Sequence, residues 1–138
     1  MGKKLYRLIA ADGWSGAAAW SKMADSIAPT IVGGSKKHGG PDLGPTRAKQ
    51  AWKALKVNGH LLANAPPPKD FVGLPALTVQ MVALLQGFPP KWEFSGKKTN
   101  AYRQVGNAFP PPVAKAIATE IKKALQKDKR QRSFEEVA

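Results

Sequence analysis

With 138 residues, this chain is one domain or one lobe of a larger assembly, and its small interior makes support from a partner plausible. Its 22 lysines and arginines against nine acidic residues give a formal charge of +13, which attracts polyanions and favours nucleic acid over an anionic membrane. Without any cysteine, and with only His38 and His60, disulfides and thiolate metal sites are excluded and a zinc site is not expected.

Four helices are predicted in chain order. The first is Ala-rich and spans residues 14–25. The second spans residues 46–57, with Thr46 as its cap and Gly59 as its stop. The third, apolar on most sides, spans residues 78–86 from a capping Thr78 to the position before Gly87. The fourth spans residues 113–127 and follows three prolines. We expect its apolar face to be formed by Val113, Ile117, Ile121, Ala124 and Leu125.

The connecting segments are rich in glycine and proline. A short strand is expected at residues 92–94 and a charged, frayed tail at residues 128–138, so the predicted class is α+β. No signal peptide or apolar run of about 20 residues is present, and a cytoplasmic location without membrane insertion is expected.

The glycine-rich segment around residues 34–39 has the spacing that opens a phosphate-binding loop. Gly40 and Pro41 stand where that loop needs Lys and Ser or Thr, so a nucleotide site is excluded. Two interpretations remain, a plain surface loop and a DNA-contact loop that offers lysines to phosphates or guanine edges. The candidate DNA-binding residues are Ser35, Lys36, Lys37, Arg47 and Arg103.

The segment of residues 101–112, AYRQVGNAFPPP, is the most informative part of the chain. Gly106 and Asn107 tolerate positive φ, which predicts a tight turn whose backbone faces a ligand, although a turn that merely enters the next helix has the same composition. The earlier segment of residues 77–90, LTVQMVALLQGFPP, would by itself indicate only a core helix and a turn.

Together these two segments resemble motifs IX and X of cytosine-C5 DNA methyltransferases. The resemblance covers about residues 27–125, and the stretch that begins Ala-Pro-Thr-Ile-Val-Gly-Gly at residue 28 is similar to the target recognition region of bacterial restriction–modification members. Many members have Arg-Glu where this chain has Gln80-Met81, and Arg where it has Leu84, which puts local contacts in doubt rather than the family.

The resemblance implies a divided enzyme. The family's S-adenosylmethionine loop, Pro-Cys nucleophile and Glu-Asn-Val segment precede the recognition region, and none is present here. The chemistry needs a thiolate to attack C6 of a flipped cytosine and a glutamate to stabilise N3 before the methyl group reaches C5, so the chain alone should be inactive. The start Met1-Gly2-Lys3-Lys4 favours a true gene product over an arbitrary fragment.

The predicted function is therefore recognition and completion of the cofactor site in a two-chain DNA methyltransferase. The alternative is a DNA-binding module or remnant without a catalytic partner. Residues 1–100 would form the recognition region, residues 101–127 motif X and a helix that docks on a Rossmann-like catalytic domain of another chain, and residues 128–138 the tail. Implied cofactor contacts are Asn107, Ala108 and Phe109, and the implied partner interface comprises Val113, Ile117, Ile121 and Leu125. The implied partners are double-stranded DNA, S-adenosylmethionine and the catalytic chain.

Overall fold

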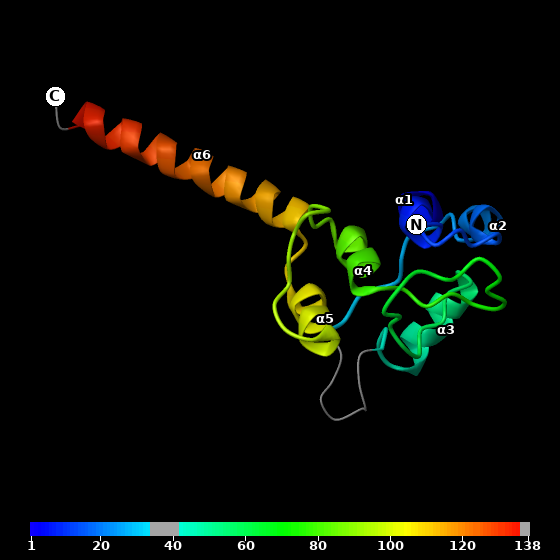
Figure 1. Cartoon of the computed structure of the whole chain (residues 1–138). Coiled ribbons are helices and arrows are strands. Elements are labelled where there is room, and N and C mark those ends of the chain that lie inside the picture. Colours follow the sequence, from blue (N-terminus) through cyan, green and yellow to red (C-terminus); the bar gives the residue numbers. More distant parts are fainter. Residues whose placement is uncertain (34–41, 136–138) are drawn as a thin grey trace. The chain divides into compact units, whose positions relative to one another are not determined.

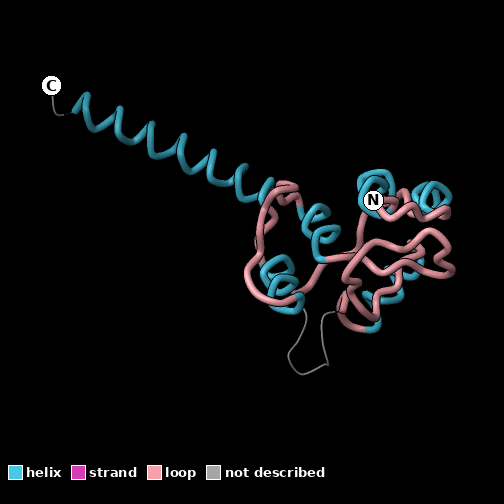
Figure 2. The backbone as a smooth tube through the Cα atoms, in the orientation of Figure 1, coloured by secondary structure: helices cyan, strands magenta, loops and turns pink. Residues whose placement is uncertain are grey.

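The computed structural model describes residues 1–33 and 42–135, with side chains through residue 128. The chain forms two compact units, Met1–Ala108 and Phe109–Ala138. Helices joined by loops make up the described residues, and no strand is found among them, as Figure 2 shows. Two isolated bridges, Gly13 with Pro68 and Ala63 with Thr78, are the extended pairings described. The β part of the expected α+β class is therefore wrong for these residues.

The strand expected at residues 92–94 is one part of this correction. Its aromatic residues pack locally instead of pairing along a backbone ladder. The ring of Phe88 lies 5.6 Å from that of Trp92 and 5.1 Å from that of Phe94. A hydrophobic cluster thus takes the place of a strand whose ladder would have needed a neighbour.

The amino-terminal helices form the first part of the core. Helix α1 (Gly2–Ile9), which was not predicted, buries Leu5 and Ile9. It packs against α2 (Ala17–Met23) and α4 (Val79–Gln86). The helix expected at residues 14–25 is thus shorter at both ends. Trp14 lies before it and is buried in the core, where its indole nitrogen donates to the Phe71 carbonyl oxygen at 2.9 Å.

Helix α3 (Thr46–Ala54) is confirmed with its predicted start, but its predicted cap and its predicted end are wrong. Pro45 occupies the cap position and Thr46 is already helical, so the Thr46 side chain caps nothing. The helix stops before Lys56, whose φ of 57° is left-handed, and not at Gly59. Trp52 is fully buried on its inner face.

Helix α4 (Val79–Gln86) is bounded as its local sequence predicts. The Thr78 hydroxyl oxygen accepts a hydrogen bond from the Met81 backbone N–H at 3.2 Å, and Gly87 ends the helix with φ of 89°. Helix α5 (Lys98–Asn107), which was also not predicted, packs against α4. It contributes Ala101, Tyr102 and Val105 to the core.

Helix α6 (Pro111–Glu135) makes up most of the second unit (Figure 1). The predicted helix of residues 113–127 is confirmed but too short, since α6 begins at Pro111 and continues through Glu135. Lysine, arginine, glutamine and glutamate dominate this extension and favour helix. The apolar residues of its predicted face are all exposed: Val113 45%, Ile117 49%, Ile121 55% and Leu125 59%.

Candidate functional site

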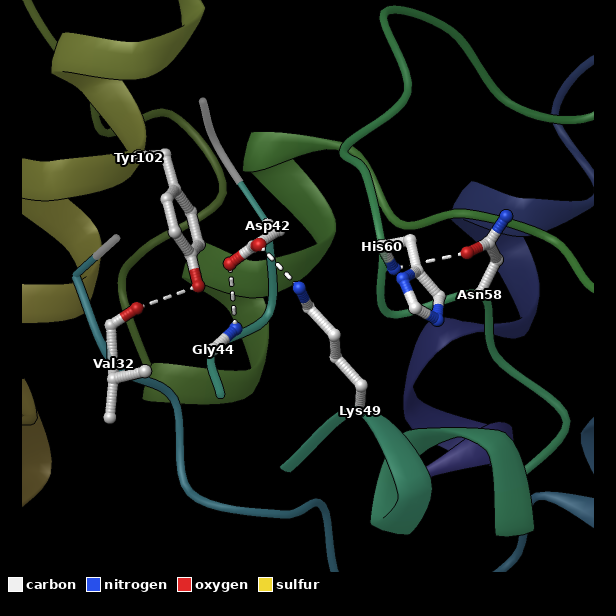
Figure 3. Close-up of polar contacts among 7 residues, drawn as sticks. All are labelled: Val32, Asp42, Gly44, Lys49, Asn58, His60 and Tyr102. Carbon is white, nitrogen blue, oxygen red and sulfur yellow. Dashed lines mark hydrogen bonds and ion pairs between the residues drawn. The ribbon is translucent and has the colours of Figure 1, made fainter. Parts of the chain in front are cut away.

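Tyr102 links the end of the chain's first unit to a segment 70 residues earlier. Its ring is fully buried on the inner face of α5, and its hydroxyl donates to the Val32 carbonyl oxygen at 2.8 Å (Figure 3). Burial raises the pKa of Tyr102 to about 12, and the negative charge of Asp42 adds to the shift. The hydroxyl therefore stays protonated and remains a donor at any physiological pH.

Gly106 lies one helical turn after Tyr102. It lies against Gly33, the residue that follows Val32. A Cβ added at Gly106 would lie 2.8 Å from the Val32 carbonyl carbon and closer still to the backbone of Gly33. Only glycine permits this approach without displacing backbone. The predicted tight turn at Gly106 and Asn107 is therefore wrong. Both residues end α5, neither has positive φ, and the glycine serves close packing.

Asn107 completes this contact. Its side chain occupies the space beside Gly33, where an added Cβ would lie 2.7 Å from the Asn107 Cγ. Asn107 is nonetheless exposed to solvent. One side of its amide is thus restricted by Gly33.

Asp42 marks the other described end of the glycine-rich segment. Its carboxylate accepts from the Gly44 backbone N–H at 3.0 Å and pairs with Lys49 of α3 at 2.6 Å, and Figure 3 shows it between Tyr102 and Lys49. Gly44 has φ of 110°, and a Cβ there would lie 2.7 Å from a methyl carbon of Val32. The residues that flank the segment 34–41 on its two sides therefore lie next to each other.

The predicted site residues are only partly gathered by this arrangement. Ser35, Lys36 and Lys37 lie outside the described residues. Arg47 is exposed at the start of α3, and Arg103 is half-buried on α5 next to Tyr102. Among the implied cofactor contacts, Asn107 and Ala108 belong to the first unit and Phe109, 59% exposed, to the second. The contacts of Val32 and Gly33 were not predicted, because their partners on α5 lie about 70 residues away in the chain. The ion pair of Asp42 with Lys49 lies within a short stretch of the chain and was not predicted either.

Two absences apply to the described part of the chain. None of its helices is both long and apolar enough to cross a membrane. The described side chains of residues 1–33 and 42–128 also bring together no group of three or more histidine, cysteine or acidic residues that could hold a metal ion.

Comparison with protein families shows the family to which the chain belongs. The sequence pattern of the family described as "C-5 cytosine-specific DNA methylase" matches residues 18–123, about three-quarters of the chain. The chain belongs to this family. The family expected from residues 77–90 and 101–112 is thereby confirmed, and the match includes Val32, Gly33 and all of α5.

Individual members of the C-5 cytosine-specific DNA methylase family agree. The type II methyltransferase M.NaeI of Lentzea aerocolonigenes is 59% identical over 128 residues, which are 91% of this chain and 31% of M.NaeI. The type II methyltransferase M.NgoMIV of Neisseria gonorrhoeae is 40% identical over 137 residues, 93% of this chain and 41% of the relative. DNA (cytosine-5)-methyltransferase 2 of Arabidopsis thaliana is 49% identical over 87 residues, 54% of this chain and 6% of the relative. No solved structure matches.

The chain thus spans about a third of M.NaeI and two-fifths of M.NgoMIV. Most of the length of each relative has no counterpart in these 138 residues.

Proposed function

We propose that this chain supplies target recognition and one wall of the cofactor site to a cytosine-C5 DNA methyltransferase whose catalytic part is a separate chain. The proposed product is DNA methylated at C5 of cytosine, and the proposed setting is a restriction–modification system. Family membership supports the reaction class. These 138 residues contain no cysteine, so the thiolate nucleophile that the reaction needs must come from outside them.

The exposed apolar face of α6 is the observation that carries the two-chain proposal. Val113, Ile117, Ile121 and Leu125 follow one another at intervals of four residues, which places them along one side of a helix. Each is between 45% and 59% exposed. Covering one such aliphatic side chain stabilises an interface by about 1–2 kcal/mol, so the row fits a docking surface better than a solvated one.

The proposed cofactor contacts fit S-adenosylmethionine chemically. An exposed carboxamide at Asn107 can both donate and accept hydrogen bonds, and the exposed ring of Phe109 offers an aromatic face to a purine or a sulfonium. When bound, the cofactor supplies the electrophilic methyl group. In this proposal the chain's own residues bind and orient it, and the nucleophile comes from the other chain.

For DNA, the proposed contacts are Ser35, Lys36, Lys37, Arg47 and Arg103. Arg47 is exposed on α3, the helix whose Lys49 holds Asp42 near the glycine-rich segment. Cationic side chains near that segment suit phosphate contacts, which set the register on a duplex before any base is read.

The test is reconstitution. This chain is co-expressed with the part of M.NaeI that lies outside the aligned third, and transfer of a tritiated methyl group to mixed-sequence duplex DNA is measured. Transfer that requires both chains is expected, with none from either alone. A stable complex without transfer, or no complex, would reject the two-chain enzyme. Retained DNA binding in that case would favour the non-catalytic DNA-binding module.

A further inference from the structure

We propose that Tyr102 and Gly106 are positioning residues that hold the Val32–Gly33 backbone against Asn107 and thereby fix the direction of the Asn107 amide. The inference rests on the proposed function, because that function gives the amide its ligand. Tyr102 and Gly106 act through Asn107 and do not contact the cofactor in this proposal.

The contacts of Tyr102 and Gly106 fix how the Val32–Gly33 segment is aligned along α5. Tyr102 and Gly106 are four residues apart on α5 and so share one face of the helix. Tyr102 binds the carbonyl oxygen of Val32, and Gly106 meets the backbone of Gly33, the next residue. A shift that moved Val32 against Gly106 would break the hydrogen bond and bring a branched side chain against helix backbone. The Val32–Gly33 segment is therefore fixed both along α5 and in its distance from it.

The Tyr102 hydroxyl is not needed to fill the core. A phenylalanine ring would bury the same apolar surface, and burying a phenol instead requires a hydrogen-bond partner. That partner is the carbonyl of Val32, which lies outside helices and whose residue is 37% exposed. The neighbouring Ile31 packs on the hydrophobic core, whereas the hydroxyl constrains the exposed Val32 that follows it.

Gly33 transmits this constraint to Asn107. The Asn107 side chain fills the space that a side chain at Gly33 would need. Any displacement of Gly33 therefore changes the room available to the exposed amide. Val32 is also in contact range of Gly44, and the Asp42–Lys49 pair holds that neighbouring corner.

The first arm of the experiment uses the isolated full chain and nuclear magnetic resonance. Tyr102→Phe removes only the hydroxyl, and Tyr6→Phe is the matched control because Tyr6 is 43% exposed on α1. Tyr102→Phe should shift the Gly33 amide and the Asn107 side-chain amide resonances and speed hydrogen exchange at Gly33 about tenfold. The α1 and α2 resonances should not change. Identical Gly33 and Asn107 signals in both variants would overturn the inference.

The second arm uses the reconstituted enzyme and S-adenosylmethionine. Tyr102→Phe and Gly33→Ala should each raise the KM for S-adenosylmethionine about tenfold and leave kcat within about twofold. In an Asn107→Ala background, Tyr102→Phe should raise KM no further, because both changes act on one contact. An undiminished tenfold rise in that background would show that Tyr102 acts elsewhere and would overturn the inference.

The two arms separate the possible failures. If wild-type reconstitution yields no methyl transfer, the proposed function fails, and the resonance shifts of the first arm still decide whether Tyr102 positions Asn107. If wild type transfers methyl groups but the Asn107→Ala background does not mask Tyr102→Phe, only the positioning inference fails.

Discussion

The buried hydroxyl of Tyr102 gives the folded chain a measurable dependence on alkaline pH. Its pKa is raised from 10.0 to about 12 in the folded state, chiefly by burial and secondarily by Asp42. Between these values the unfolded chain loses the proton first, so the contribution to stability is complete below pH 10 and is lost as pH rises through 12. A two-unit shift corresponds to about 2–3 kcal/mol.

Tyr102→Phe has no group to titrate at this position, which makes it the reference. The free energy of unfolding should fall more steeply for wild type than for Tyr102→Phe as pH rises above 10, with a difference of about 2–3 kcal/mol near complete ionisation. Urea titrations at several pH values measure this. All other side chains are the same in wild type and Tyr102→Phe, and Tyr6→Phe is the control for the loss of an exposed phenol. Parallel curves for wild type and Tyr102→Phe would show that the phenol is not shielded as the structure has it.

Lys36 and Lys37 are among the residues proposed to contact DNA. If they read base edges or phosphates, replacing both with alanine should weaken DNA binding of the reconstituted enzyme by about 1–3 kcal/mol, measured by fluorescence anisotropy. Lys3 and Lys4 are adjacent exposed lysines on α1, so their double alanine variant removes the same charge elsewhere. An equal loss in both double variants would assign the effect to net charge alone.

Helix α3 ends in a strained backbone conformation. Lys56 follows the cap residue Leu55 and has φ of 57°, a left-handed conformation that suits glycine. Lys56→Gly should stabilise the chain by up to about 1 kcal/mol, since it removes the steric penalty and leaves the carbonyl that accepts from the Trp20 indole. Lys53→Gly, inside the helix, should destabilise by about 1 kcal/mol. Thermal unfolding compares the two, and the same sign for both would contradict the left-handed end.

Helix α6 carries the interface prediction. Ile117→Asp should abolish association with the catalytic chain and therefore methyl transfer, because an unpaired charge would be buried among aliphatic side chains. Gln126→Asp is the control, since nine residues further on a helix lies on the opposite side. Size-exclusion chromatography of the co-expressed chains measures association. If Ile117→Asp unfolds the isolated chain while wild type is a stable monomer, the exposed face is not a docking surface.

Some helix bounds can be predicted from neighbouring residues in the sequence, and others cannot. The bounds of α4 were predicted because Thr78 and Gly87 signal them within a few residues. Helix α5 was missed because Gly106 and Asn107 have turn composition, and what they do is set by Gly33, more than 70 positions earlier. The residues of the motif were identifiable from their pattern. Their contacts were not, since no local signal pairs Tyr102 with Val32 or Asp42 with Lys49.

For the whole molecule, the distribution of charge matters more than any single residue. The +13 net charge comprises +2 in residues 1–28, +5 in residues 29–70, +3 in residues 71–110 and +3 in residues 111–138. Positive charge on every part of the chain favours contacts with several phosphates over one strong contact. Each neutralised phosphate releases condensed counterions, and this release is the driving force that added salt weakens.

The isolated chain should therefore bind duplex DNA weakly, with an affinity that falls steeply with salt. The slope of log affinity against log salt concentration should be about −0.9 for each phosphate contacted, measured by anisotropy with one duplex over a range of salt. Removing one phosphate-contacting cation, for example by Arg47→Ala, should reduce the slope by about one contact and weaken all sequences alike. An anionic vesicle is the control for non-specific charge, since it should compete poorly with DNA at equal phosphate. An affinity independent of salt would mean that the positive charge does not bind phosphates, and the proposed partner would then be wrong.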